Sequence, residues 1–406
     1  MKNILVLTSG YCGKSTANGI CTKTLVNEIE QNACSVHVIS VDVDMICETG
    51  SERVKSIHIP RKAVKKKRKS KLRSIVRLLK NVLLYSYTAR YNKNMVKQIV
   101  KESEKLFEEN SFDAIVCMYF PLEAIIAGQI LKKKYSDSQF IVFELDSVED
   151  GIAGGGKFNS YMLNASRRIM KKLYESCDLI MILQCHETYW LKKFSKYKER
   201  MKVTDLPLLI PVVNQQEKEQ IDSVVQFVYA GTLNDFYRSP KHMLDMFENI
   251  AGFDWSIDFY TKGCEKELED FAGIHKNVKL NGYVEQSVLD TKIETSDILL
   301  SIGNKVSNSL PSKIITYMTF GKPIIHFCLQ ENDICKQYLS KYPLSLIIER
   351  NEKASYSAQR VVDFVKAHLG NSVCFNELCK SFYKNLPSYS ADIMLGCINA
   401  KEKKLS

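Results

Sequence analysis

Apolar residues along the chain alternate between two spacings. Short, largely apolar runs at residues 4–7 and 36–41 predict buried strands, and between them Cys21, Leu25 and Ile29 fall on one face of a predicted helix. A strand, a helix and a strand in this order predict a βαβ unit, and such units form parallel sheets covered by helices. The alternation continues with predicted strands at 114–118, 139–145 and 178–183 and predicted helices at 121–134, 159–175 and about 187–196.

The second half of the chain repeats this order of elements after a linker at 204–213 that contains two prolines. Predicted strands lie at 226–231, 256–260, 278–280, 297–301 and 323–327, and predicted helices lie at 239–250, 286–295, 312–319 and, interrupted at Pro387, from about 355 to 404. We therefore predict an α/β fold of two tandem Rossmann-like domains facing a cleft, residues 1–205 and 206–385, with a C-terminal helix at 386–406 returning to the first domain. Ligands of such sheets bind at the carboxyl ends of the strands.

Size and composition are those of a globular protein with two domains of about 200 residues each. The chain has 406 residues, of which 45% are hydrophobic and 25% are charged. No apolar run approaches the roughly 18 residues that span a bilayer, and residues 4–7 are too short for the apolar core of a signal peptide, so we expect a cytoplasmic protein. The 13 cysteines form no CxxC pair and the seven histidines no HExxH pair. We therefore predict no disulfide framework, no protein-held metal and no other cofactor.

The net charge of +11 is concentrated in one segment. Residues 61–80 contain 11 Lys and Arg residues and no acid, and the remaining 46 basic residues equal the acidic residues in number. Six apolar residues follow between 78 and 85, and a basic cluster joined to an apolar helical stretch is typical of a protein lying on an anionic membrane leaflet, at roughly 1 kcal/mol per basic side chain. A solvated loop is the alternative. Because the segment lacks the interleaved aromatics of a base-stacking groove, we predict no nucleic-acid partner.

The stretch GYCGKST at 10–16 follows the first strand and resembles the phosphate loop of a nucleoside triphosphatase. That loop requires a glycine five positions before the second glycine of GxxxxGK[ST]. Here the position is Thr8, and Gly10 is only three positions before Gly13, so the triphosphatase interpretation fails. Gly10, Gly13 and Gly19 then have two open interpretations. They allow backbone N–H groups to face an anionic ligand at the start of a helix, or they only make a tight turn.

Five segments in the same order resemble the family 4-like glycosyltransferases of the GT-B fold, in particular bacterial surface-polysaccharide enzymes. They are STANGICTKTLVNEIEQNACSVHVIS at 15–40, FVYAGTLNDFYRSPKHML at 227–244, YTKGC at 260–264, NVKLNGYV at 277–284 and SDILLSIGNKVSNSLPSKIITYMTFGKPIIHF at 296–327. The last is similar to the family's PSKifEYmaaGKPii block. The resemblance implies a hexosyl- or related glycosyltransferase that takes its sugar from a nucleotide diphosphate sugar without a metal.

The resemblance assigns the donor to the second domain. A metal-independent transferase must neutralise the charge that develops on the diphosphate with basic side chains and N–H dipoles. Arg238 follows the AGTL strand, and Ser312 and Lys313 begin the PSKI helix, which are the positions where the family places such groups. The alternative is that Lys313 is an ordinary exposed helix lysine. For Arg238, too, the alternative is a purely structural role without ligand contact.

Two departures from the family concern the donor site. The family often has two glutamates eight positions apart, the second hydrogen-bonded to the donor ribose, and these positions hold Asn308 and Thr316 here. Thr316 is thus a candidate for a ribose contact, but neither residue can serve as a carboxylate. Thr232 replaces the arginine that often follows the AGTL-type glycine, which leaves fewer cations for the diphosphate.

The acceptor would be held by the first domain, where the family presents a histidine or aspartate after the strand predicted at 139–145. Asp146 is the candidate that orients or deprotonates the acceptor hydroxyl, with Glu144, Glu149 and Asp150 as competitors. A solvated acidic loop is the alternative.

The resemblance implies a retaining transferase that acts on a lipid-linked oligosaccharide or similar acceptor in capsule, exopolysaccharide or lipopolysaccharide synthesis. The basic segment 61–80 would hold it at the cytoplasmic face of the membrane. Two other functions stay open: a nucleotide-sugar epimerase on the same scaffold, and a non-catalytic, membrane-associated partner protein that kept the fold.

Overall fold

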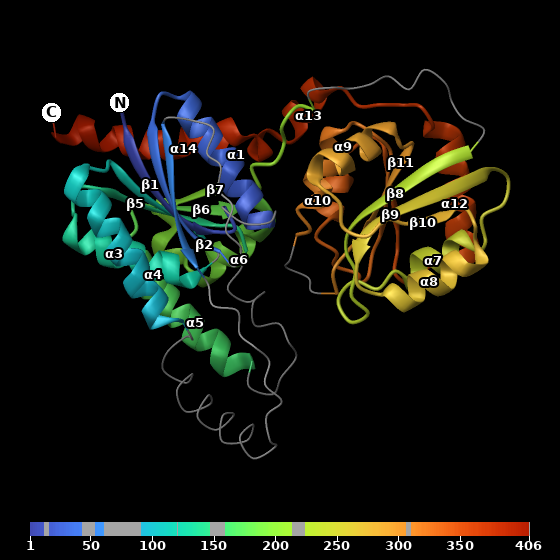
Figure 1. The fold of residues 1–406 in the computed structure, drawn as a ribbon, viewed down its shortest axis with the longest axis horizontal. Coiled ribbons are helices and arrows are strands. Elements are labelled where there is room, and N and C mark those ends of the chain that lie inside the picture. The colour runs from blue at the N-terminus through green and yellow to red at the C-terminus, as the bar shows by residue number, and fades with distance from the viewer. Residues whose placement is uncertain are drawn as a thin grey trace, which may run out of the picture. The chain divides into compact units, whose positions relative to one another are not determined.

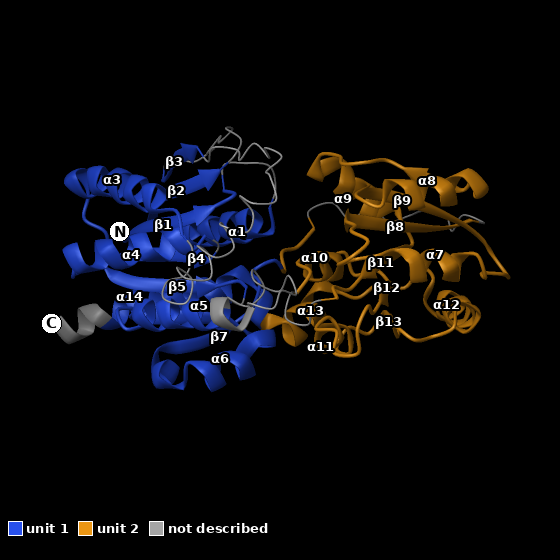
Figure 2. Cartoon of the chain, turned by 90° about the horizontal axis from the view of Figure 1, so that it is seen from below, with its two compact units in different colours: residues 1–208, 384–406 blue, residues 209–383 orange. Residues whose placement is uncertain are grey.

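The computed structural model describes residues 1–11, 16–42, 53–60, 91–119, 121–146, 159–212, 224–305 and 310–405. They form two compact units: unit 1 comprises residues 1–208 and 384–406, and unit 2 comprises residues 209–383 (Figure 2). The predicted domain boundaries were 205/206 and 385/386. The basic segment 61–80, together with Gly13, Glu149, Asp150 and Asn308, lies outside the described residues.

Unit 1 is a parallel sheet with helices on both faces, and its described residues give a seven-stranded sheet of order β3-β2-β1-β4-β5-β6-β7 (Figure 1). Its strands are β1 (Asn3–Ser9), β2 (Ser35–Asp42), β3 (Val54–Pro60), β4 (Ala114–Tyr119), β5 (Gln139–Glu144), β6 (Leu179–Leu183) and β7 (Met201–Thr204). Its helices are α1 (Ala17–Gln31), α3 (Lys93–Glu109), α4 (Leu122–Lys134), α5 (Asn159–Tyr174), α6 (Glu187–Lys193) and α14 (Pro387–Leu405). The connections through α1 and through α3 and α4 run in opposite directions along the sheet, and right-handed crossovers therefore place these helices on opposite faces.

Unit 2 repeats this plan with a described six-stranded parallel sheet of order β10-β9-β8-β11-β12-β13. Its strands are β8 (Val224–Thr232), β9 (Asp254–Lys262), β10 (Val278–Leu280), β11 (Ile298–Ile302), β12 (Ile324–Phe327) and β13 (Ser345–Ile348). Its helices are α7 (Lys241–Phe247), α8 (Glu265–Ile274), α9 (Gln286–Thr295), α10 (Lys313–Thr319), α11 (Lys336–Leu339), α12 (Ala354–His368) and α13 (Phe375–Ser381). Both sheets have the 3-2-1-4-5-6 strand order of a dinucleotide-binding fold, so the predicted pair of Rossmann-like domains is confirmed.

Burial explains why these strands could be found in the sequence. Every residue of β4, β5, β6, β11 and β12 is buried, because a parallel sheet covered on both faces needs apolar side chains on both sides of each strand. The C-terminal helix α14 packs against α1 in unit 1, which confirms that the end of the chain returns to the first unit. Among the described residues, no helix combines the length and the apolarity needed to cross a membrane.

The sequence analysis missed several elements whose pattern is weak. Strands β3 and β7 lie at the two edges of the first sheet and β13 at one edge of the second, and β3 and β7 each carry exposed polar positions. Helices α3 and α8 were also missed. Each has a single apolar stripe between many charged residues, so only the part that faces the sheet carries a hydrophobic signal.

Candidate functional site

The strand order locates the candidate site of unit 2. The chain leaves β8 towards β9 and leaves β11 towards β12, in opposite directions, so the topological switch point lies between the carboxyl ends of β8 and β11. Ligands of open α/β sheets bind at such a point, because the two connections diverge and leave the backbone ends open. Arg238 follows β8, and the segment 303–305 follows β11.

Arg238 bridges the two sides of this switch point. Its Nε and Nη2 donate to Oδ1 of Asn304, at 3.0 and 2.7 Å, and its Nη1 donates to the backbone oxygen of Thr232 at 3.4 Å. An antiparallel backbone bridge between Asn234 and Arg238 closes the loop that carries the guanidinium. All these partners are neutral, and within the described part of the chain no carboxylate forms an ion pair with Arg238. None of the described residues therefore neutralises its positive charge.

Tyr317 of α10 fills a gap in the sheet at the same point. The last residues paired between β11 and β8 are Leu300 and Tyr229, so the next β8 residue, Ala230, has no β11 partner. The Tyr317 hydroxyl takes that place: it accepts from the Ala230 N–H at 2.7 Å and donates to the Ala230 carbonyl oxygen at 3.2 Å. This fully buried side chain thereby fixes α10 against the carboxyl end of β8.

Lys313 begins α10 one turn before Tyr317 and so lies on the same helix face, towards the end of β8. The side chain is half-buried, and burial lowers the pKa of its ammonium group. No salt bridge or hydrogen bond of this ammonium group is present among the described residues, but the negative charge of Asp290 partly offsets the effect of burial on its pKa. A half-buried lysine of this kind, at the start of the helix that Tyr317 fixes to β8, would suit an anionic ligand.

The other predicted donor-site residues are placed as follows. Ser312 precedes α10 and caps it with its backbone only, since its side chain forms no capping hydrogen bond. The helix has only seven residues, so its dipole adds little beyond the Lys313 charge. Thr316 is half-buried, and its hydroxyl donates weakly to the Ser312 backbone oxygen at 3.5 Å. The assignments of Ser312, Thr316 and Asn308 stay predictions.

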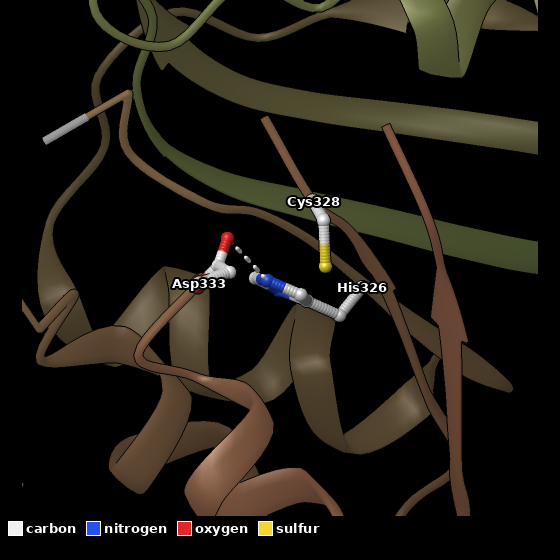
Figure 3. Close-up of side chains that lie close together, drawn as sticks. All are labelled: His326, Cys328 and Asp333. Carbon is white, nitrogen blue, oxygen red and sulfur yellow. Dashed lines mark hydrogen bonds and ion pairs between the residues drawn. The ribbon is translucent and has the colours of Figure 1, made fainter. Parts of the chain in front are cut away.

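A buried cluster supports the segment that carries Asn304. It contains His326, Cys328 and Asp333, whose side chains Figure 3 shows. His326 Nδ1 contacts the Ser301 hydroxyl at 3.0 Å, and its Nε2 contacts Asp333 Oδ2 at 3.2 Å. Burial alone would raise the pKa of Asp333, but the hydrogen bond and charge of His326 lower it below its usual value. A Cβ atom at Gly303 would lie 1.8 Å from Asp333 Oδ2. Only glycine therefore lets the segment 303–305 rest on this carboxylate.

The same cluster contains metal-ligand chemistry that the sequence analysis missed. His326, Cys328 and Asp333 are all buried, and their ligand atoms lie within 4.8 Å of one another (Figure 3). Zinc binds these atom types. However, both imidazole nitrogens have protein partners, and Asp333 Oδ1 accepts from the Cys335 N–H at 3.0 Å. The cluster is thus satisfied as a structural brace, and the absence of a protein-held metal stays a prediction.

The glycine turn of unit 1 is explained by packing at the two glycines that the structure describes. Gly10 has a φ of +79°, and its N–H donates to the buried carboxylate of Asp42. The Gly19 N–H donates to the Thr16 hydroxyl at 3.1 Å. A Cβ atom at Gly10 would lie 2.1 Å from the Thr16 hydroxyl, and one at Gly19 would lie 2.0 Å from the Gly10 carbonyl oxygen. Contact of the turn with α1 therefore accounts for both glycines. A ligand-facing role for Gly19 or Gly13 stays a prediction.

Two acidic side chains at the end of β5 differ sharply in environment. Glu144 is fully buried, and burial raises its pKa to about 8. Asp146 is half-buried. Burial raises the pKa of the Cys21 thiol, and the negative charges of Asp146 and Asp205 raise it further. Asp146 and Asp205 therefore lie near α1 at the carboxyl edge of the sheet. Of the described acids proposed after β5, Asp146 is the more accessible, and Glu144 is enclosed by protein.

No protein-family model matches the chain, and no curated protein is significantly similar to it. Solved structures match nearly its whole length. The lipopolysaccharide outer core galactosyltransferase WaaB is 12% identical, with 98% of this chain and 99% of that chain covered and a TM-score of 0.57. WaaG, a glycosyltransferase involved in lipopolysaccharide biosynthesis, is 12% identical, with 96% and 99% covered and a TM-score of 0.57.

A third match carries a different activity in its name. The N-terminal domain of a trehalose-6-phosphate phosphatase from Candida albicans is 9% identical, with 98% of this chain and 97% of that chain covered and a TM-score of 0.60. At such identities these likenesses establish the fold, which is the two-domain GT-B fold predicted from the sequence. The activity has to be argued from the site.

Proposed function

We propose that the protein is a glycosyltransferase that moves a sugar from a nucleotide diphosphate sugar to an acceptor hydroxyl. The observation that carries this proposal is the Arg238 guanidinium at the switch point of unit 2, which neutral oxygens hold and which has no acidic partner among the described residues. Lys313 adds a second cation, which has no salt bridge among the described residues, on the helix that Tyr317 fixes to the same strand end. The two side chains suit a diphosphate, which carries about two negative charges when it leaves the sugar.

In this mechanism most of the rate comes from stabilising the leaving diphosphate. Arg238 and Lys313 would bind it more tightly as its charge grows, without a metal ion. Thr316 would contact the donor ribose, and Asn308 would be a further hydrogen-bonding contact of the donor. Asp146 in unit 1 would orient the acceptor hydroxyl or accept its proton, and the donor phosphate would share that role in a retaining reaction.

The membrane part of the proposal rests on the sequence. The 11 basic residues at 61–80 would bind an anionic leaflet, which suits a lipid-linked oligosaccharide acceptor at the cytoplasmic face of the membrane. Replacing these 11 residues with glutamine should abolish sedimentation with vesicles that contain phosphatidylglycerol, with no effect on the thermal unfolding temperature. Unchanged sedimentation would refute membrane binding without touching the donor site.

A nucleotide-sugar epimerase is the second candidate. A UDP-N-acetylglucosamine 2-epimerase is 12% identical, with 96% of this chain and 93% of that chain covered and a TM-score of 0.52. Such an enzyme would use the same diphosphate contacts but would also need acid and base groups on both sides of the sugar. It would turn over its donor in the absence of any acceptor.

One assay separates these functions. Release of nucleoside diphosphate from UDP-, GDP- and TDP-sugars is measured with and without a bacterial lipid extract. A transferase releases it only, or much faster, with the acceptor, and Arg238→Ala and Asp146→Asn should each lower that rate at least about 100-fold. Acceptor-independent conversion would indicate the epimerase. No release, together with no binding of UDP, GDP or TDP, would leave the non-catalytic partner.

A further inference from the structure

Asn304 and Arg238 form a two-point hydrogen-bonded contact across the switch point of unit 2. They are 66 positions apart in the sequence and lie on opposite sides of the switch point, after β11 and β8. One amide oxygen accepts both Nε–H and Nη2–H. A guanidinium held through two of its nitrogens by one acceptor cannot rotate away without losing both bonds, so Asn304 sets the direction of Arg238.

Asn304 can do this because its own backbone is fixed from three sides. The Gly303 N–H donates to the Phe327 carbonyl oxygen at 3.0 Å, and the Lys305 N–H donates to the Tyr237 carbonyl oxygen at 2.9 Å. The side chain of Gln330 donates to the Asn304 carbonyl oxygen at 3.0 Å. The segment 303–305 is thus tied to β12, to the following loop and to the loop that carries Arg238.

The neutrality of Asn304 matters as much as its geometry. An aspartate in its place would keep both acceptor contacts, and charge-assisted bonds to arginine are stronger than neutral ones. It would also cancel the positive charge that an anionic ligand needs. The acid nearest in sequence, Asp235, accepts from the Cys264 thiol at 2.9 Å instead. Among the described residues, the surroundings of Arg238 therefore provide acceptors without providing a counter-charge.

We propose that Asn304 is a positioning residue that fixes the Arg238 guanidinium across the switch point while leaving its charge available to the diphosphate of the ligand. This inference rests on the proposed function, because it takes Arg238 as the diphosphate contact. It predicts that stability and anion affinity respond in opposite directions to one substitution. A scaffold role alone predicts that they change together.

The test compares Asn304→Asp and Asn304→Ala in the full chain, with Asn249→Asp as control. Asn249 is exposed and lies just after α7, whose carboxyl end is at the amino ends of the strands, so ligand binding by this variant reports the effect of one added charge. Its unfolding temperature also reflects the loss of the bond from Asn249 Nδ2 to the Asp245 carbonyl oxygen, at 2.7 Å. Binding of inorganic pyrophosphate, UDP, GDP and TDP is measured by calorimetry, and the unfolding temperature by scanning calorimetry. We expect Asn304→Asp to keep or raise the unfolding temperature and to weaken binding at least about 10-fold, and Asn304→Ala to lower the unfolding temperature and weaken binding less.

The outcomes distinguish this inference from the proposed function. If Asn304→Asp binds pyrophosphate as well as the native protein, or better than Asn304→Ala, the inference is wrong although the transferase proposal stands. If the native protein binds pyrophosphate and none of the nucleotides, the transferase proposal is wrong, and the pyrophosphate affinities still judge Asn304. No binding of any probe overturns both. Should Asn304→Asp fail to fold, native affinity in Asn304→Ala overturns the inference, and weakened binding by folded Asn304→Ala supports it.

Discussion

The Tyr174 hydroxyl donates a hydrogen bond of 2.6 Å to Oε1 of Glu144, and both side chains are fully buried beneath the end of β5. Oε2 of Glu144 has no hydrogen-bond partner among the described residues. Burial raises the pKa of the carboxyl group to about 8 from an ordinary value of 4.5. The group is therefore mostly protonated at pH 7, which avoids placing a charge in the core.

This contact predicts how the stability of the protein depends on pH. Between pH 4.5 and about 8 the folded protein keeps the Glu144 proton and the unfolded chain loses it. Raising the pH across this window should therefore lower the free energy of unfolding, by up to about 1.4 kcal/mol per pH unit, with no further loss above it. Glu144→Gln cannot ionise, so the difference in stability between this variant and the native protein should grow in favour of the variant from pH 5 to 8.

Urea denaturation of both proteins at pH 5, 6, 7 and 8 measures this difference. Tyr174→Phe provides a comparison, because it removes the hydrogen bond and leaves the carboxyl group in place. A constant difference between Glu144→Gln and the native protein over this range would show that Glu144 titrates near its ordinary pKa.

The glycine turn predicts a contrast between two helical glycines of unit 1. Gly19→Ala would drive a Cβ atom to 2.0 Å from the Gly10 carbonyl oxygen, whereas Gly396→Ala in α14 meets nothing within 4 Å. We expect Gly19→Ala to lower the free energy of unfolding by about 1–3 kcal/mol, and Gly396→Ala to raise it by about 0.5–1 kcal/mol. Guanidinium denaturation checks both. Native stability in Gly19→Ala would mean that the turn opens easily, which would revive its interpretation as a ligand-binding loop.

The sequence predicted the parts of the fold that depend on burial. The central residues of β5, 140–143, are all apolar because both faces of the strand are covered, so the pattern is visible without any partner. The edge strand β7, with the sequence MKVT, is short and half polar, and its pairing with β6 depends on a neighbour that the local sequence does not identify. This is why α/β alternation could be predicted and the full width of each sheet could not.

The same limit applies to the candidate site. Arg238 and Lys313 could be proposed because each follows a strand and fits a family pattern. Asn304 and Tyr317 were missed, because their roles depend on contacts with residues 66 and 87 positions away. The local signal for Asn304 was a polar amide two residues after a buried strand. Whether an arginine keeps its charge available for a ligand depends on the residue that it contacts. Tertiary structure, and not the local sequence, determines which residue that is.

We expect the charge of Lys313 to lower the stability of the protein and to raise its affinity for nucleoside diphosphates. Its ammonium group is half-buried and has no salt bridge in the described structure, and burial lowers its pKa although the charge of Asp290 partly offsets this effect. Lys313→Met keeps the apolar stem and removes the charge, so the free energy of unfolding should stay the same or rise. Affinity for UDP, GDP or TDP should fall at least about 10-fold, because a charged hydrogen bond to phosphate is lost. The matched control is Lys366→Met. Lys366 is exposed in the last turn of α12, at the amino ends of the strands. Equal affinities for both variants would leave Lys313 an ordinary helix lysine.

Tyr317→Phe tests whether the end of β8 must be held for the site to work. Its hydroxyl serves both polar groups of Ala230 where β11 no longer pairs with β8, so its removal leaves a buried N–H and carbonyl without their partner and should cost about 1–3 kcal/mol of stability. Tyr342→Phe is the control. The Tyr342 hydroxyl donates to the Lys322 carbonyl oxygen at 2.7 Å, just before β12 and thus at the amino ends of the strands.

Both variants should be less stable in urea, and they should differ in nucleotide binding. Tyr317→Phe frees the helix face that carries Lys313, so its affinity for nucleoside diphosphate should fall several-fold, by analogy with the loss of a positioning contact. Tyr342→Phe should bind as the native protein does. If both variants lose stability and neither loses affinity, the cations reach the ligand without help from this contact, and Tyr317 only completes the sheet.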